Sequence, residues 1–484
     1  MFDRTRTGIV LRYWPIGLWL LVGILVGRVI PIIPDFSIAP GSIIVFSVLA
    51  GMLLLWCFRD SVEFNLLFVA APFVLLHWKE ILQTQEIIAG VPVNLSDVIV
   101  VMYCLVQGVA TFSKDRRSSH FAPPEWFGLV AFGIIGIGLG FIYGNPARDI
   151  IRNARVVFYF VMPFLVTYSL VNNEDKVRKA LNLCVPLGLM TVLTIWRVAW
   201  QGIVSSNVSI HQSGVLMANV VNVVGVTVDY GIWLYLQSLC FLLSRQRQRT
   251  HATLKTLLHG AMIVLLLTAM VISGLRTMWI VISLVSLYVV LVLRRLRPGL
   301  IVLISMAILA GVLVTVQLIG AITGADGLEI LSKRLDLSES FFGRLEDTNQ
   351  VIVAVNERQG WFLGNGLGAS TRILDVLPLV SPDVEAWTGV HNSYAWYYLN
   401  LGLAGLVCLL LLIGRVFCVT FLGWRLLRGK PGQHRVLAAN ASVLAITIYA
   451  LPSATLSVAP GAIVAAGIMF AVALRLGEFK RNRS

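Results

Sequence analysis

Charged residues are scarce in this sequence. Only 13% of its 484 residues are Asp, Glu, Lys or Arg, whereas 57% are hydrophobic. Soluble domains carry about a quarter of charged residues, so a single water-soluble core is excluded. The six cysteines all lie in apolar stretches, without the spacing of a metal site or a disulfide framework. The alternating pattern of a membrane β-barrel is also lacking.

What the sequence contains instead is a series of apolar stretches, each near the roughly 20 residues that a helix needs to cross a bilayer. We therefore predict an all-α fold, a polytopic membrane bundle of about 12–14 transmembrane helices. The predicted spans lie near residues 9–30, 41–58, 62–78, 95–112, 126–144, 155–171, 181–199, 221–243, 256–273, 277–293, 299–320, 393–414, 435–452 and 457–475.

The formal net charge of +14 raises the question of nucleic-acid binding. The basic residues, however, form short clusters between apolar stretches, so we expect no nucleic-acid partner and read the clusters as cytoplasmic loops. Both basic termini are then cytoplasmic. The clusters are Lys114, Arg116 and Arg117; Lys176, Arg178 and Lys179; Arg245, Arg247, Arg249 and Lys255; Arg294, Arg295 and Arg297; and Arg425, Arg428, Lys430 and Arg435.

The same alternation places one long segment of mixed charge on the outer face. It divides the chain into a first bundle of about 11 spans (1–320), a periplasmic loop (321–391) and the C-terminal spans with a cytoplasmic tail (392–484). Phe342, Leu345, Val351, Ile352 and Val355 recur in the loop at roughly helical spacing, which predicts amphipathic helices packed on the bundle.

Several arginines are predicted on the outer face. The tendency of Lys and Arg to remain in cytoplasmic loops does not explain their presence there. Together they favour a phosphate or diphosphate site, because guanidinium binds phosphate oxygens bidentately and stays charged. Alternatively, each reaches toward lipid headgroups or pairs with a loop carboxylate. They are Arg148, Arg152, Arg155, Arg276 and Arg344.

Two further features lie near the end of the predicted loop. His391 and Asn392 begin HNSYAWYYLNLGLAGL, and a histidine there could accept a proton from a hydroxyl group, although most lone histidines are structural. The aromatic residues that follow, including Tyr394, alternatively form an interfacial belt. GWFLGNGLGAS (360–370) lacks the strand and helix context of a nucleotide loop. We expect a tight turn whose backbone N–H groups are free to face a ligand.

Three segments in order, SGLRTMW, GRLEDTNQVIVAVNERQGWFLGNGLG and HNSYAWYYLNLGLAGL, together resemble the O-antigen ligase and O-antigen polymerase superfamily of bacterial envelope glycosyltransferases. The resemblance spans roughly residues 271–406. It implies a fold related to the C-type glycosyltransferases, a site on the periplasmic face of the inner membrane, and undecaprenyl-diphosphate-linked glycan as donor, without a cofactor or metal.

The resemblance also implies roles for individual residues. The catalytic residues of the superfamily correspond to Arg276 and His391. Further positions expected to bind the diphosphate or the glycan are Arg152, Arg155, Arg344, Asn392, Tyr394 and His211. His211 lies in NVSIHQSGVLMANVVN, where many relatives carry an arginine instead, so this sequence departs from the pattern there.

Three functions remain open from the sequence. The first is a polymerase that joins lipid-linked repeat units of a surface polysaccharide with inversion at the anomeric carbon, with a chain-length regulator as a candidate partner. The second is a ligase that transfers the glycan to lipid A core or protein. The third is a flippase for an anionic lipid, against which the lack of internal repeats counts.

Overall fold

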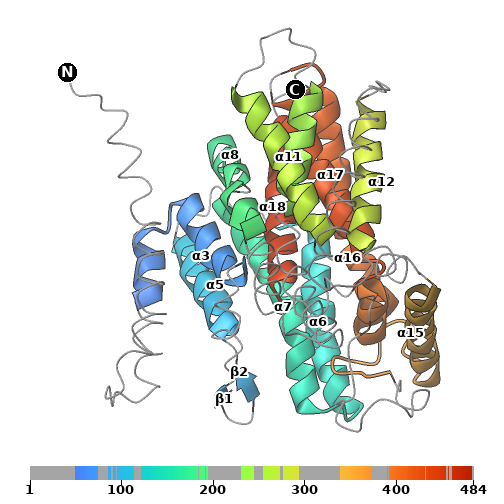
Figure 1. The fold of residues 1–484 in the computed structure, drawn as a ribbon. Coiled ribbons are helices and arrows are strands. Elements are labelled where there is room, and N and C mark those ends of the chain that lie inside the picture. The colour runs from blue at the N-terminus through green and yellow to red at the C-terminus, as the bar shows by residue number, and fades with distance from the viewer. Residues whose placement is uncertain are drawn as a thin grey trace, which may run out of the picture.

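The computed structural model describes residues 50–74, 86–88, 91–93, 95–113, 122–183, 185–190, 192–193, 231–244, 254–272, 276–293, 338–371, 390, 392–430, 432–453, 456 and 460–481. Helices dominate them (Figure 1), so the predicted all-α class is confirmed. The main helices are α3 (Val62–Val74), α5 (Leu95–Ser113), α6 (Pro124–Ile142), α7 (Ala147–Leu170), α8 (Glu174–Asn182), α11 (Leu254–Ile272), α12 (Arg276–Val292), α15 (Ser338–Glu357), α16 (Ser393–Leu426), α17 (Gln433–Tyr449) and α18 (Pro460–Arg481).

A short hairpin precedes α5. Its strands, β1 (Glu86–Ile88) and β2 (Val91–Val93), pair antiparallel with Glu86 opposite Val93. Three residues per strand are too few to form a sheet that could carry a core. The hairpin therefore leaves the fold class unchanged.

Among the described residues, four helices are long and apolar enough to cross a membrane: α6, α7, α16 and residues Gly461–Arg481 of α18. Shorter apolar helices accompany them at Asp97–Ala110, Gly231–Ser244, Thr256–Leu267 and Thr277–Val292. These helices coincide with predicted spans, which confirms a helical membrane protein. The total number of spans and the domain limits stay predictions.

Two helices extend beyond the spans predicted for them. The sixth span was expected from residue 155, but α7 begins at Ala147, because the polar residues before 155 continue the helix beyond the apolar stretch. The predicted span 393–414 ends where Arg415 interrupts the apolar run. Arg415 instead pairs with Glu125 of α6 at 3.4 Å, and α16 continues to Leu426.

The core of the bundle forms around α18, which is buried from Gly461 to Gly477 and packs mainly against α7 and α16. Alanines and glycines are frequent along it, and small residues let helix backbones approach closely. A Cβ at Gly467 would lie 2.6 Å from the carbonyl oxygen of Phe160 in α7. Close packing against α7 therefore depends on this glycine.

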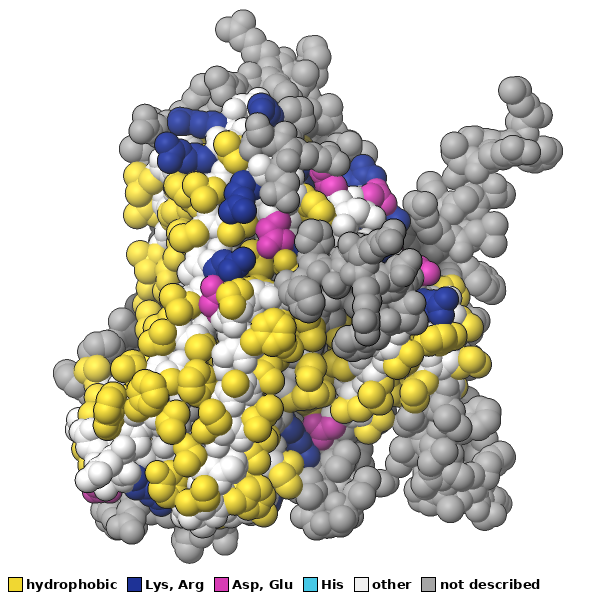
Figure 2. Space-filling model, turned by 180° about the vertical axis from the view of Figure 1, so that it is seen from behind, with side chains coloured by type: hydrophobic (Ala, Val, Ile, Leu, Met, Phe, Trp, Pro, Cys, Tyr) yellow, Lys and Arg dark blue, Asp and Glu magenta, His cyan; other side chains and the backbone are white. Residues whose placement is uncertain are grey.

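The two ends of the bundle are formed by different elements. At one end, with α8 and the C-terminus, Arg475 pairs with Glu478 at 3.3 Å and Lys480 pairs with Glu174. Figure 2 shows charged side chains gathered mostly toward one end of the molecule, with hydrophobic side chains over most of the remaining described surface. At the other end lie α15 and the turn between α6 and α7 (Figure 1).

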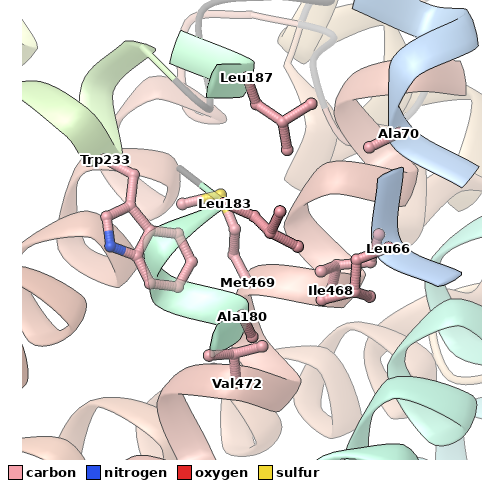
Figure 3. Close-up of a pocket in the computed structure, with 9 residues that line it drawn as sticks. All are labelled: Leu66, Ala70, Ala180, Leu183, Leu187, Trp233, Ile468, Met469 and Val472. Carbon is pink, nitrogen blue, oxygen red and sulfur yellow. The ribbon is translucent and has the colours of Figure 1, made fainter. Parts of the chain in front are cut away.

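An apolar pocket lies where α3, α8, the helix Gly231–Ser244 and α18 come together. In Figure 3, Trp233, Leu183, Met469 and Val472 surround it, and its other lining residues are apolar as well. No side chain that lines it is charged, so it offers nothing to hold a phosphate. The diphosphate site expected from the sequence therefore does not lie in this pocket.

Candidate functional site

The glycine-rich turn after α15 is the point where the motifs meet. Gly364, Gly366 and Gly368 all have positive φ angles, of 80°, 76° and 84°. A Cβ on the first would lie 2.6 Å from the backbone of Asn400 in α16, and one on the third 2.8 Å from the nitrogen of Ile150 in α7. A Cβ on Gly366 would overlap the backbone of Gly140 in α6. Each glycine therefore lets the turn touch a different helix.

Several N–H groups of this turn are occupied within the protein. The amide of Asn365 donates to the carbonyl of Leu399 at 2.8 Å, and that of Leu367 donates to the carbonyl of Gly136 at 2.8 Å. The amide of Gly364 donates to the carbonyl of Gly360 at 2.7 Å. For these three amides, the expectation of an N–H group free to face a ligand is therefore wrong. The turn is a packing element that holds α6, α7 and α16 together.

The break in α16 explains why the turn is needed. Gly402, with φ 67°, interrupts the helix and frees neighbouring backbone groups. The turn satisfies them, because the amides of Leu403 and Ala404 donate to the carbonyls of Trp361 and Phe362 at 3.0 and 3.1 Å. The second and third sequence segments thus form one structural unit.

Buried amide side chains connect this unit to α7. The Nδ2 of Asn153 donates to the Oδ1 of Asn400 at 3.0 Å, and the Nδ2 of Asn400 donates to the carbonyl of Trp396 at 3.0 Å. On the α6–α7 turn, the Nδ2 of Asn145 donates to the carbonyls of Asn365 and Leu367, both at 3.1 Å. The first residues of α7 are therefore held in fixed register with the turn.

The arginines of α7 lie on one face of that helix. Arg148, Arg152 and Arg155 follow one another at intervals of four and three residues, and Tyr159 continues the same face. Arg148 and Arg152 are exposed, whereas the side chain of Arg155 is 21% exposed. We call these four residues the α7 stripe. No described carboxylate forms an ion pair with Arg152.

Asp97, in the first turn of α5, anchors the deeper part of the α7 stripe. Its carboxylate forms an ion pair with Arg155 at 3.2 Å and accepts a hydrogen bond from the Tyr159 hydroxyl. Arg155 lies eight residues beyond the start of α7, or roughly 12 Å along the axis. A cation that is mostly withdrawn from solvent is costly unless an anion or water meets it. Asp97 therefore compensates the charge of Arg155.

The start of α16 is fixed by its own polar groups. The Oδ1 of Asn392 accepts from the amides of Tyr394 and Ala395 at 3.0 and 3.3 Å, which caps the helix. The Tyr394 hydroxyl donates to the carbonyl of Thr447 at 2.8 Å. Trp396 and Tyr397 are 1% and 0% exposed, so they are core residues, and the interfacial belt considered from the sequence is wrong for them.

The remaining predicted site residues are placed only in part. Arg276 is the first residue of α12 and Arg344 lies within α15, but their side chains are outside the described part of the structure. His391 and His211 lie outside the described residues altogether. The structure thus assembles Arg152 and Arg155, and the joint site with Arg276, Arg344, His391 and His211 stays a prediction.

Sequence reasoning missed Asp97, Tyr159, Asn153 and Asn400. Asp97 is 58 residues from Arg155, so only the fold brings them together. Asn153 and Asn400 did carry a signal, because amides inside apolar helices are costly unless they find a partner. Tyr159 could have been found from the spacing of the arginines before it.

Comparison with known proteins adds one finding. Residues 261–410 match the family model described as O-antigen ligase. This stretch includes α12, α15, the glycine-rich turn and the broken part of α16. No curated protein matches the chain significantly.

Proposed function

Because residues 261–410 match the O-antigen ligase family model, we propose that this chain is a member of the O-antigen ligase and O-antigen polymerase superfamily and transfers glycan from undecaprenyl diphosphate. The match supports a membrane glycosyltransferase of this type. The donor, the reaction and its location at the periplasmic face of the bacterial inner membrane are our proposal. Both termini are then cytoplasmic, and the α15 end of the bundle faces the periplasm.

The observation that carries the proposal is the α7 stripe. In the proposed orientation, the arginines of α7 offer guanidinium groups at the depth of lipid headgroups, and no described carboxylate forms an ion pair with Arg152. Arg155 lies one turn deeper and is oriented by Asp97 at 3.2 Å. A lipid-linked diphosphate presents its charge at the same level of the bilayer, and guanidinium matches its oxygens.

The proposed reaction is a single displacement. A hydroxyl oxygen of the acceptor attacks the anomeric carbon of the donor, and the bond from that carbon to the diphosphate oxygen breaks. The hydroxyl proton passes to His391, and the lipid diphosphate leaves with the bonding electrons. One displacement inverts the configuration at the anomeric carbon. No covalent intermediate with the protein is needed.

Arginine accelerates such a step because negative charge grows on the bridging oxygen as the bond breaks. A guanidinium placed there binds the transition state more tightly than the ground state, which is the condition for catalysis. We assign this role to Arg276. Arg152, Arg155 and Arg344 hold the diphosphate, while Asn392, Tyr394 and His211 contact the glycan. No resident cofactor or metal is part of this scheme.

We favour a polymerase, whose acceptor is a second lipid-linked repeat unit of an O-antigen or exopolysaccharide. The long N-terminal portion before residue 261 and the unusual loop around His211 support this choice. The competing ligase would use lipid A core or protein as acceptor. A chain-length regulator is a candidate partner for the polymerase only.

Purified protein in vesicles, given lipid-linked repeat units, tests the proposal. We expect a ladder of longer lipid-linked glycans, and at least a hundredfold lower rate for Arg276→Ala and for His391→Ala, since loss of one such group costs about 2.7–4 kcal/mol. Arg178→Ala, a change of an exposed arginine in α8, serves as the matched control and should retain the rate.

The product identifies the function. If glycan were transferred once to lipid A core and no ladder formed, the protein would be a ligase and not a polymerase. Movement of the donor across the membrane with no new glycan bond would replace the enzyme by a flippase. If all variants had equal rates, the assignment of Arg276 and His391 to the catalytic site would be wrong.

A further inference from the structure

The glycine-rich turn begins with two exposed aromatic side chains. Trp361 is 58% exposed and Phe362 is 51% exposed, and their rings make an edge contact with centroids 5.6 Å apart. The residues just before them, 356–359, are also exposed, but all four are polar or charged. The surface therefore changes from polar to aromatic within a few residues.

The aromatic pair is attached to the point where α16 resumes after its break. Trp361 and Phe362 accept backbone hydrogen bonds from Leu403 and Ala404, at 3.0 and 3.1 Å. The part of α16 after the break, 403–426, is roughly 36 Å long at 1.5 Å per residue, which matches the thickness of a bilayer with part of its headgroups. The pair thus lies at one end of the membrane-crossing part.

An exposed apolar face of α16 starts at the same place. Leu403, Val407, Leu410 and Leu411 are 40–56% exposed. Their spacing of four, three and one residues puts them on one side of the helix. In a membrane helix such a face contacts lipid tails. Trp361 and Phe362 extend it at its end. Tryptophan, whose ring is amphipathic, is enriched at membrane–water interfaces, and the phenyl ring of Phe362 adds apolar surface beside it.

We propose that Trp361 and Phe362 insert into the phospholipid bilayer at the boundary between headgroups and acyl chains. This interfacial pair sets the depth of the glycine-rich turn. Because the turn contacts α6, α7 and α16, the same anchor sets the depth of the first turns of α7. The inference concerns contact with the lipid surface and holds whichever reaction the protein catalyses.

Depth-dependent quenching tests this contact. The chain has 13 tryptophans, so an environment-sensitive fluorophore is attached to a single cysteine in a cysteine-free background of the full chain in phospholipid vesicles. The variants are Trp361→Cys, Asn356→Cys as the exposed polar control, and Leu410→Cys as the control in the middle of the span. Phe362→Cys repeats the measurement at the neighbouring side chain.

The anchor predicts a distinct pattern for each label. At 361 and 362, nitroxides near the headgroups should quench about twofold more than nitroxides at the chain ends, with little quenching by aqueous iodide. The label at 356 should respond to iodide, and the label at 410 to the deep nitroxide. Iodide quenching at 361 and 362 equal to that at 356 would overturn the proposal. Protection from every quencher would overturn it too, because a second protein copy would then cover the pair.

Discussion

Asn153 of α7 and Asn400 of α16 share a buried hydrogen bond of 3.0 Å between their side-chain amides. The two residues are 4% and 0% exposed. They join the helix that carries the α7 stripe to the broken helix that begins beside His391. The hydrogen bond thus fixes α7 against the first part of α16.

The contact should be measurable as a coupling energy. We expect Asn153→Ala and Asn400→Ala each to destabilise the protein, and the double variant to lose about 0.6–2 kcal/mol less than the sum. Thermal unfolding in detergent gives the four values. Asn349→Ala, which changes an exposed amide of α15, is the control and should stay within about 0.5 kcal/mol of the parent. Strict additivity would contradict the contact.

Gly366 should not tolerate a side chain. Gly366→Ala places a methyl group onto the backbone of Gly140 and adds the strain of a left-handed conformation, about 1–2 kcal/mol. The expected result is a large loss of folded, monodisperse protein in fluorescence-detected size exclusion. Gly138→Ala in α6, where a Cβ meets open space, is the matched change and should preserve the yield. Equal yields would refute the packing role of the turn.

Removal of Asp97 should be more harmful than removal of the whole ion pair. Asp97→Ala takes a counter-ion away from Arg155 at depth in the bundle, which costs on the order of 2 kcal/mol. The double variant Asp97→Leu/Arg155→Met removes both charges and should recover part of this stability. The test compares the apparent melting temperatures of the parent, Asp97→Ala and the double variant. A double variant less stable than Asp97→Ala would show that the charges do not compensate each other.

Arg475 of α18 should not be replaceable by lysine. Its Nε donates to the backbone carbonyl of Tyr168 at 2.9 Å, and its guanidinium carbon lies 3.6 Å from the centre of the Tyr168 ring. The same guanidinium also forms an ion pair with Glu478. Lysine has no planar guanidinium group and cannot make these three contacts at once. We expect Arg475→Lys to destabilise the bundle by about 1–3 kcal/mol. Arg428→Lys, at an exposed position of the loop after α16, should have no measurable effect on thermal unfolding.

The positions of most helices follow directly from the sequence, because a bilayer demands apolar stretches of a set length. The predicted span at 95–112 and α5 (Leu95–Ser113) nearly coincide. Hydropathy failed where a helix continues in polar residues. Ala147–Ala154 and Arg415 are polar or mixed in character, yet both belong to helices because their side chains find partners or solvent.

Few contacts around the candidate site residues could be predicted from the sequence. Spacing alone places Arg152 and Arg155 on one helix face. The opposing carboxylate of Asp97 and the carbonyls of Gly136 and Leu399, which occupy the N–H groups of the turn, belong to distant parts of the chain. Their positions depend on tertiary packing, which local patterns do not encode.

Recognition of the donor's diphosphate by the arginines of α7 is tested most directly by a binding measurement. The dissociation constant for undecaprenyl diphosphate is measured in vesicles for the parent protein, Arg152→Gln and Arg178→Gln. We predict that Arg152→Gln weakens binding about tenfold or more, as expected for the loss of a charge-assisted hydrogen bond. Arg178→Gln should bind like the parent. Equal affinity for the parent and Arg152→Gln would contradict the account.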